Sequence, residues 1–326
     1  MTAVAEPFAH PALFYRDERE YLAGVVPFVR AGLEAGEPVA VAVPGENLRL
    51  IEAGLGRDAA AVRLLDMREA GRNPGRIIPA VLCAFADEGA AGRRVRIVGE
   101  PVWAGRTPDE YPACAQHEAL INTAFRGREV TILCPYDAVR LDERALADAR
   151  ATHPVVLARG SAAAGARSGT LAEQAGTPCA QAGTAYAPDR VLARCNEPLP
   201  VVREAVCFAF TAGTLSRARH VAAAEAARLG LAGTRLEDLA LTAAELTTNS
   251  VVHGGGSGEL RVWAAGGHVL CEVRDAGRLD DPLAGRRPAV RGQRGGRGLL
   301  LVNLVADLVR VHTGGRGTTV RCWFAH

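Results

Sequence analysis

Three polar side chains that could take part in chemistry follow one another at intervals of four residues: Glu245, Asn249 and His253. In a helix this spacing drifts by only about 40° per step, so the three would share one stripe with Asp238 and Thr242. A carboxylate beside a bound phosphate can orient a nucleophile, and an amide oxygen is a hard ligand that suits Mg²⁺. The spacing alone favours an ordinary solvated polar face, so its meaning depends on the segments that follow.

Three short segments downstream of this stripe contain glycine. Asp275-Ala-Gly277 comes directly after an apolar run, and Gly317-Thr318-Thr319 follows the penultimate predicted strand. A glycine-rich run opens a predicted helix: Gly295, Gly296, Arg297, Gly298 and Leu299. Glycines at the start of a helix can present backbone N–H groups and the positive end of the helix dipole to phosphates. One such cluster is often only a turn, but the order of all four segments is highly specific.

These segments lie in a predicted α+β domain. Its strands are expected at 204–210, 259–264, 268–274, 308–313 and 318–324, and its helices at 214–229, 234–252 and 298–306. Thr214 is expected to cap the first helix, and Thr234 to form a capping box with Glu237 at the start of the second. The apolar side of the second helix, which includes Leu239 and Leu246, should pack on a mixed sheet that carries all helices on one face.

In this order of motifs, residues from about 196 to 326 resemble the GHKL ATPase superfamily, which has the Bergerat ATP-binding fold. Within it they are most similar to the RsbW-type anti-sigma-factor serine kinases. The resemblance implies ATP and Mg²⁺ as cofactors, with Asn249 as the Mg²⁺ ligand and Glu245 activating the attacking hydroxyl or water. It also implies that Asp275 accepts a hydrogen bond from the adenine amino group, that Gly277 lets the base approach, and that Thr318 supports the adenine.

The same resemblance implies that the glycine-rich run wraps the phosphates through Gly295, Gly296 and Gly298. The implied nucleotide-binding set is completed by His253, Arg297 and Leu299. Six arginines lie between the Asp275-Ala-Gly277 segment and the start of the predicted helix at 298: Arg278, Arg286, Arg287, Arg291, Arg294 and Arg297. All 38 cationic residues are arginine, so one or two of the six would neutralise the γ-phosphate; the alternative is that they decorate a mobile loop. The lack of lysine excludes Schiff-base chemistry, P-loop nucleotide binding and eukaryote-like kinases.

The first half alternates short apolar runs with helical stretches. Strands are expected at 12–15, 38–43, 62–65, 95–98 and 130–134, with helices between and after them at 18–34, 46–54, 79–86, 110–125 and 142–151. This alternation predicts a mostly parallel sheet covered on both faces. Residues 8–157 resemble the MEDS sensory domain on segments 10–15, 21–29, 71–74, 98–103 and 134–137. The resemblance implies a RecA-like α/β fold that senses small organic molecules, and without a lysine-containing P-loop it should not hydrolyse nucleotide.

Scattered histidines and cysteines in this half do not predict a metal site. His10, Glu100, His117 and Cys134 are unrelated by any ligand spacing, and the eight cysteines include no CxxC pair. We expect these residues to be structural and the thiols to be reduced in a cytoplasmic protein without a signal segment or membrane span. A sensory pocket is expected at the carboxyl ends of the strands, with three residues in its wall: Glu100, Trp103 and Tyr136.

Residues 158–190 are rich in Gly, Ala, Ser and Thr, and are expected to form a flexible linker between domains 8–157 and 191–326. The combined resemblance, to anti-sigma regulators of actinobacteria, implies a signal-responsive ATP-dependent serine/threonine kinase. It would sequester a sigma factor and phosphorylate a STAS-type anti-anti-sigma protein; such proteins are often homodimers. One alternative is a nucleotide-gated binding module without phosphotransfer. The other, a sensor histidine kinase, needs a phosphoacceptor hairpin that the linker does not encode. The weakly basic second half gives no argument for nucleic-acid binding.

Overall fold

The chain folds into two compact units. A computed structural model describes residues 7–89, 92–158, 179–182, 185–289, 292 and 296–326. The first unit comprises Met1–Arg72 and Val81–Leu192, and the second comprises Asn73–Ala80 and Ala193–His326. Within the described part, none of the helices combines the length and the apolar character needed to cross a membrane.

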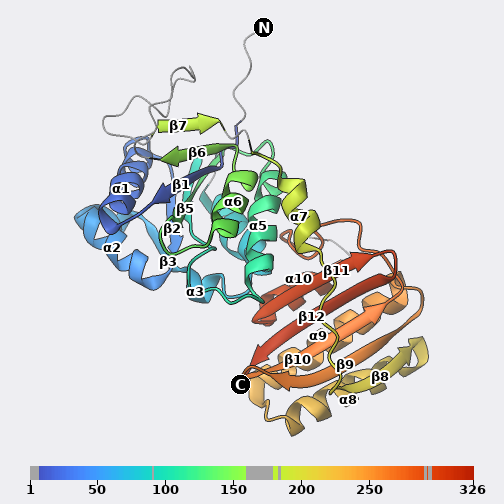
Figure 1. Ribbon diagram of the computed structural model, residues 1–326. Coiled ribbons are helices and arrows are strands. Elements are labelled where there is room, and N and C mark those ends of the chain that lie inside the picture. The colour runs from blue at the N-terminus through green and yellow to red at the C-terminus, as the bar shows by residue number, and fades with distance from the viewer. Residues whose placement is uncertain (1–6, 90–91, 159–178, 183–184, 290–291, 293–295) are drawn as a thin grey trace. The chain divides into compact units, whose positions relative to one another are not determined.

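The first unit is built on a seven-stranded sheet, coloured blue to green in Figure 1. Its strands lie in the order β3-β2-β4-β5-β1-β6-β7, and all neighbours are parallel except β6 and β7. The strands are β1 (Pro11–Tyr15), β2 (Val39–Val43), β3 (Arg63–Asp66), β4 (Val95–Gly99), β5 (Val130–Asp137), β6 (Val155–Ala158) and β7 (Cys179–Ala182). All five residues of β2 are buried, which explains why the central strands have no polar alternation.

The helices of this unit cover both faces of the sheet. They are α1 (Glu18–Glu34), α2 (Gly45–Leu55), α3 (Met67–Ala70), α4 (Ala84–Gly89), α5 (Tyr111–Ala124) and α6 (Glu143–Thr152). A π-helical segment, Ile77–Cys83, precedes α4 and begins in the part of the chain that belongs to the second unit. The chain moves one way along the sheet from β1 to β3 and the other way from β3 to β6. Because such crossovers are right-handed, α1 and α2 lie on one face, and α5 and α6 lie on the other (Figure 1).

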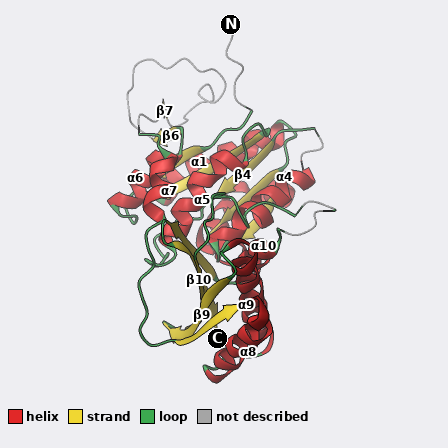
Figure 2. Cartoon of the chain, turned by 90° about the vertical axis from the view of Figure 1, so that its right-hand side faces the viewer, coloured by secondary structure: helices red, strands yellow, loops and turns green. Residues whose placement is uncertain are grey.

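The second unit is a five-stranded antiparallel sheet in the order β11-β12-β10-β9-β8. Its strands are β8 (Val206–Thr211), β9 (Ser257–Ala265), β10 (His268–Asp275), β11 (Leu308–Gly314) and β12 (Gly317–Ala325). Its helices are α8 (Leu215–Arg228), α9 (Gly233–His253) and α10 (Gly298–Val305), which lie on one side of the sheet (Figure 2). Helix α7 (Pro188–Cys195) spans the boundary between the units. The two folds are thus a parallel α/β domain and an α+β sandwich of the GHKL type.

The prediction of a mixed sheet in this second unit is wrong, and the connections explain why. Hairpins join β9 to β10 and β11 to β12, which makes both pairs antiparallel. Helices α8 and α9 together lead away from the end of β8 and return to it. Strand β9 therefore starts where β8 ended and runs antiparallel to it.

Helix starts and the predicted linker also differ from expectation. Helix α9 begins after Ala232, which provides no side-chain cap, so Thr234 lies inside the helix and the predicted capping box is absent. Thr214 precedes α8, but its hydroxyl accepts a hydrogen bond from the backbone N–H of Thr211 instead of capping the helix. Strand β7 lies within the predicted linker 158–190 and pairs with β6. Residues 159–178 and 183–184 of that linker lie outside the described residues.

Candidate functional site

Helix α9 presents the predicted polar stripe because its opposite side is buried. Leu239, Ala243 and Leu246 belong to the core of the second unit. Glu245 and Asn249 are half-buried on the other side, and His253 is exposed in the last turn. The stripe is shorter than predicted at its start: Thr242 is completely buried, and Asp238 forms an ion pair with Arg235 at 2.9 Å.

The start of α10 lies directly against this stripe. A methyl group placed on Gly298 would lie 2.5 Å from Oε2 of Glu245 and 3.3 Å from Nδ2 of Asn249. A side chain at position 298 would require the carboxylate of Glu245 to move and the amide of Asn249 to shift slightly. The structure therefore brings together the carboxylate, the amide and the glycine-rich helix start that lie about fifty residues apart in the sequence.

Asp275 is held at the end of β10 by two donors. The hydroxyl of Ser250 donates to Oδ2 at 2.6 Å, and the backbone N–H of Gly277 donates to Oδ1 at 2.8 Å. A carboxylate offers about four acceptor positions, so this half-buried group can still accept hydrogen bonds from a ligand. Ser250 is a residue that the sequence analysis missed, although it directly follows Asn249 in the same motif.

Gly277 and Thr318 close this end of the site. A methyl group on Gly277 would lie 2.6 Å from the carbonyl oxygen of His253, so only glycine allows this close approach to the end of α9. Thr318 lies opposite Asp275 in the β10–β12 register, and its hydroxyl donates to the carbonyl oxygen of Gly277 at 2.9 Å. The Thr318 hydroxyl is also 3.0 Å from that of Thr313, a second residue that was missed.

The remaining residues of the predicted phosphate-binding run are placed only in part. Gly295 lies outside the described residues, as do Arg291 and Arg294. Gly296 has a positive φ of 73°, a conformation that favours glycine. Arg297 is exposed at the N-cap position of α10, and Leu299 packs against the core.

The arginines between Gly277 and the glycine-rich run that the structure describes have different environments. Arg278 pairs with Asp280 at 2.7 Å, and Arg287 pairs with Asp281. Arg286 is buried at 7% exposure. Two of the three are thus held by neighbouring acids in this structure.

A shallow depression of about 470 Å³ lies elsewhere in the second unit, between α8 and α9. Its lining includes Arg219, His220 and Thr248 but neither Glu245 nor Asn249. The close fit of Gly298 against the stripe, and not this depression, marks the position where the predicted residues converge.

Two buried polar groups occupy the first unit. The first surrounds Glu100, which accepts hydrogen bonds from the hydroxyls of Tyr15 at 3.2 Å and Tyr21 at 3.1 Å, and from Nδ2 of Asn47 at 2.8 Å. Burial raises the pKa of Glu100 to about 7, although the three hydrogen bonds oppose that rise. Of the other expected pocket residues, Trp103 stacks on Arg106 at 3.8 Å and Tyr136 is buried; the sensory pocket itself stays a prediction.

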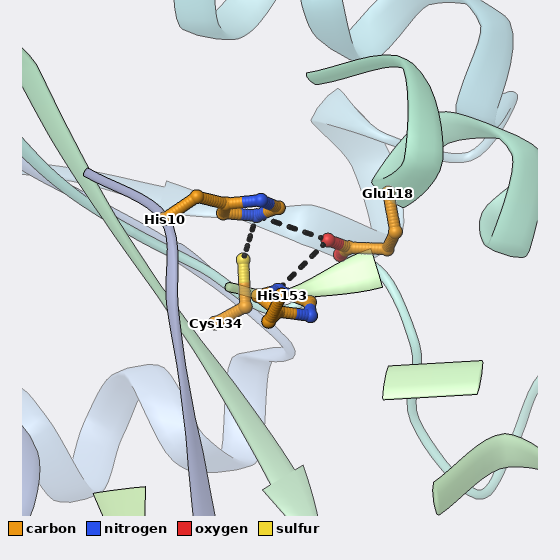
Figure 3. Close-up of side chains that lie close together, drawn as sticks. All are labelled: His10, Glu118, Cys134 and His153. Atoms are coloured by element: carbon orange, nitrogen blue, oxygen red, sulfur yellow. Dashed lines mark hydrogen bonds and ion pairs between the residues drawn. The ribbon is translucent and has the colours of Figure 1, made fainter. Parts of the chain in front are cut away.

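The second group consists of His10, Glu118, Cys134 and His153, all buried (Figure 3). His10 and Cys134 were singled out in the sequence and lie 3.3 Å apart, between Nε2 and Sγ. Glu118 and His153 were missed, whereas Glu100 and His117 are not members. Burial and the neighbouring His153 lower the pKa of His10 to about 4, against the effect of Glu118, so its ring is neutral near pH 7.

Comparisons with known proteins give a separate family match for each half of the chain. Residues 9–154 match the family model described as MEDS: methanogen/methylotroph, DcmR sensory domain. Residues 208–324 match the family model of the histidine kinase-like ATPase domain. The chain therefore joins an N-terminal MEDS sensory domain to a C-terminal histidine kinase-like ATPase domain.

A crystal structure of the RsbU and RsbW domains of Rv1364c from Mycobacterium tuberculosis shows a distant similarity. The match has 18% sequence identity and a TM-score of 0.28, and it covers 37% of this chain and 32% of that one. This chain thus spans about a third of the length of that structure. No curated protein matches the chain.

Proposed function

We propose that the C-terminal domain binds ATP with Mg²⁺ and transfers the γ-phosphate to a serine or threonine of a STAS-type anti-anti-sigma protein. In the same proposal it sequesters a sigma factor, and the MEDS domain controls both activities in response to a small organic ligand. The ATPase-domain family match and the order of the sequence motifs support this assignment.

The observation that carries the proposal is the packing of Gly298 against Glu245 and Asn249. The N–H groups at the start of α10 would face the phosphates, since helix starts bind anions. The amide oxygen of Asn249 would hold Mg²⁺, which prefers hard oxygen ligands. Glu245, one turn away on the same stripe, would accept the proton of the incoming hydroxyl.

The adenine would bind at the other end of α9. Asp275 is fixed by Ser250 and Gly277 and has acceptor positions left for an exocyclic amino group. Gly277 removes the side chain that would block the base, and Thr318 holds the Gly277 carbonyl in place. When bound, ATP supplies the phosphoryl group, while these residues orient and hold it.

Two other functions use the same site. A nucleotide-gated binding module would bind ATP and its partner without transferring phosphate. A sensor histidine kinase would transfer phosphate to its own histidine; in the described part of the chain between β7 and β8, however, α7 is a single eight-residue helix and no hairpin is present. This observation disfavours the histidine kinase, and the transfer of phosphate to a protein distinguishes the kinase from the binding module.

The destination of labelled phosphate separates these functions. The full-length protein is incubated with γ-labelled ATP, Mg²⁺ and candidate STAS-domain proteins, and the products are analysed for phosphoserine and phosphothreonine. The proposal predicts acid-stable label on the STAS protein. Acid-labile label on the chain itself would indicate a histidine kinase, and ATP-dependent partner binding without label would indicate the binding module.

A further inference from the structure

The four side chains around Glu118 come from separate elements of the first unit. His10 precedes β1, Glu118 lies in α5, Cys134 lies in β5, and His153 follows α6. None is more than 3% exposed. Figure 3 shows both rings turned towards the carboxylate and the thiol turned towards the ring of His10. Nε2 of His10 and Nε2 of His153 each lie 3.3 Å from Oε2 of Glu118.

The hydrogen bonds outside this cluster fix which ring nitrogen carries the proton. Nδ1 of His153 lies 2.7 Å from the carbonyl oxygen of Ala149, which can only accept, so Nδ1 is the donor. Nδ1 of His10 faces Oδ1 of Asn122 at 3.1 Å, and the amide is oriented because its Nδ2 donates to the carbonyl oxygen of Thr152. In the neutral rings, both Nε2 atoms therefore present a lone pair to the centre of the cluster.

The centre of the cluster consequently holds more acceptors than protons. With both rings neutral, two imidazole lone pairs and an ionised carboxylate face one another, and the donors near Glu118 are the thiol of Cys134 and the hydroxyl of Tyr136. Among the described residues, the oxygens of Glu118 and Nε2 of His153 have no partner at good hydrogen-bond geometry, and the two Nε2 atoms at 3.3 Å are the nearest polar contacts of the carboxylate in this cluster. Buried acceptors without donors are costly, and a cation at the centre would satisfy all of them.

We propose that His10, Glu118, Cys134 and His153 bind one Zn²⁺ ion. The ligand atoms all lie within 4.8 Å of one another, and three of their six separations are 3.3 Å, the length of an edge of a tetrahedral site. Zn²⁺ bonds of about 2.0–2.3 Å give tetrahedral edges of about 3.3–3.6 Å. Imidazole and thiolate select zinc-like transition ions over Mg²⁺ or Ca²⁺.

The charges and the surroundings fit the same ion. On binding, Cys134 loses its proton to solvent, and one thiolate, one carboxylate and two neutral rings balance the double positive charge. The Nδ1–H groups of both histidines donate to backbone or side-chain oxygens, as metal-bound histidines almost always do. The ion would join the start of β1, α5, β5 and the end of α6, and so stabilise the sensory domain.

Zinc binding to the full-length protein tests the proposal. Protein stripped with a chelator under reducing conditions is titrated with Zn²⁺ alone, in competition with a chromophoric chelator. We expect one ion per chain and a rise in melting temperature. Asn122 would hydrogen-bond a ligand without touching the ion, so Asn122→Ala should weaken Zn²⁺ binding by about 10–100-fold. Cys134→Ser and His153→Gln each remove a ligand and should weaken Zn²⁺ binding by more than that.

Co²⁺ substitution and a matched cysteine variant complete the test. Co²⁺ should give tetrahedral d–d bands and a thiolate charge-transfer band, and Cys134→Ser should lose the latter. Cys83→Ser removes another buried thiol of the same unit and should bind like the wild type. Asn122→Ala keeps all four ligands and serves if a ligand variant does not fold. If the wild type binds no Zn²⁺, or binds it equally well without Cys134, the cluster is a proton-only network and the proposal fails.

Discussion

Each unit places a glutamate from one of its helices among polar partners, but the surroundings are opposite. Glu118 of α5 is 1% exposed and faces two histidines and a thiol contributed by other elements. Glu245 of α9 is half-buried and lies beside Asn249 of its own helix and Gly298. A fully buried carboxylate needs a counter-charge or a bound proton, whereas a half-buried one can stay solvated until a ligand arrives. This difference fits the proposed structural ion in the first unit and the proposed exchangeable nucleotide in the second.

The largest effect is expected at the base-binding end of the second site. Asp275 can accept a hydrogen bond from the amino group of adenine, but guanine offers a carbonyl oxygen at that position. The carboxylate of Asp275 and the guanine carbonyl would be two acceptors facing each other in a desolvated pocket. ATP should therefore bind at least on the order of 10³-fold more tightly than GTP. Calorimetric titration measures both affinities; equal values would remove Asp275 from the adenine pocket.

A smaller effect is expected when Gly298 is changed to alanine. The added methyl group would move the carboxylate of Glu245 and shift the amide of Asn249 slightly, so ATP affinity should fall by no more than about 10-fold, or about 1.4 kcal/mol. Gly213→Ala is the matched control, because nothing lies within 4 Å of its methyl position. Calorimetry checks both variants. Unchanged ATP binding in Gly298→Ala would separate α10 from the nucleotide site.

A third effect concerns Glu100, another buried carboxylate of the first unit. Glu100 has a pKa of about 7 in the folded chain against an ordinary value of 4.5, because burial outweighs its bonds to Tyr15, Tyr21 and Asn47, and Asp137 adds to the rise. Between these values the folded state binds more protons, so its stabilising contribution is complete below pH 4.5 and is lost as pH rises through 7.

Glu100→Gln should remove this pH dependence and leave β4 and α1 better protected than wild type at pH 8. Hydrogen exchange of peptides from these two elements, compared at pH 5 and pH 8, measures the difference. The same pH response in variant and wild type would show that Glu100 does not carry it.

The residues that the structure brings together in the second unit could be recognised in the sequence because their signals are local; the roles assigned to them stay predictions. The polar stripe, Asp275 and the glycines lie in short motifs, and the periodicity of α9 separates its buried face from its polar one. Ser250 was missed because its bond to Asp275 depends on how α9 packs against β10, and Thr313 was missed because its contact with Thr318 depends on the pairing of β11 and β12. The antiparallel sheet order was missed because it follows from the connections between elements, which residue patterns do not specify.

The cluster in the first unit could not be predicted for a topological reason. Strand β1 lies between β5 and β6, with Ala12 opposite Cys134 and Pro11 opposite Val155. This order brings His10 next to residues more than a hundred positions away. The sequence predicts a parallel sheet but not which strands are neighbours, so His10 and Cys134 had no visible relation to Glu118 and His153.

One pair of variants tests phosphoryl transfer at the α9–α10 site most directly. Asn249→Ala should lose Mg²⁺-dependent ATP binding, and with it activity. Glu245→Gln should keep ATP affinity while phosphotransfer to the STAS protein falls by about 10²–10⁴-fold, because a positioned base acts mainly in the transition state. Glu237→Gln, an exposed position two turns earlier on the same helix, should match the wild type. Undiminished phosphotransfer in Glu245→Gln would contradict the assignment of this site as a kinase centre.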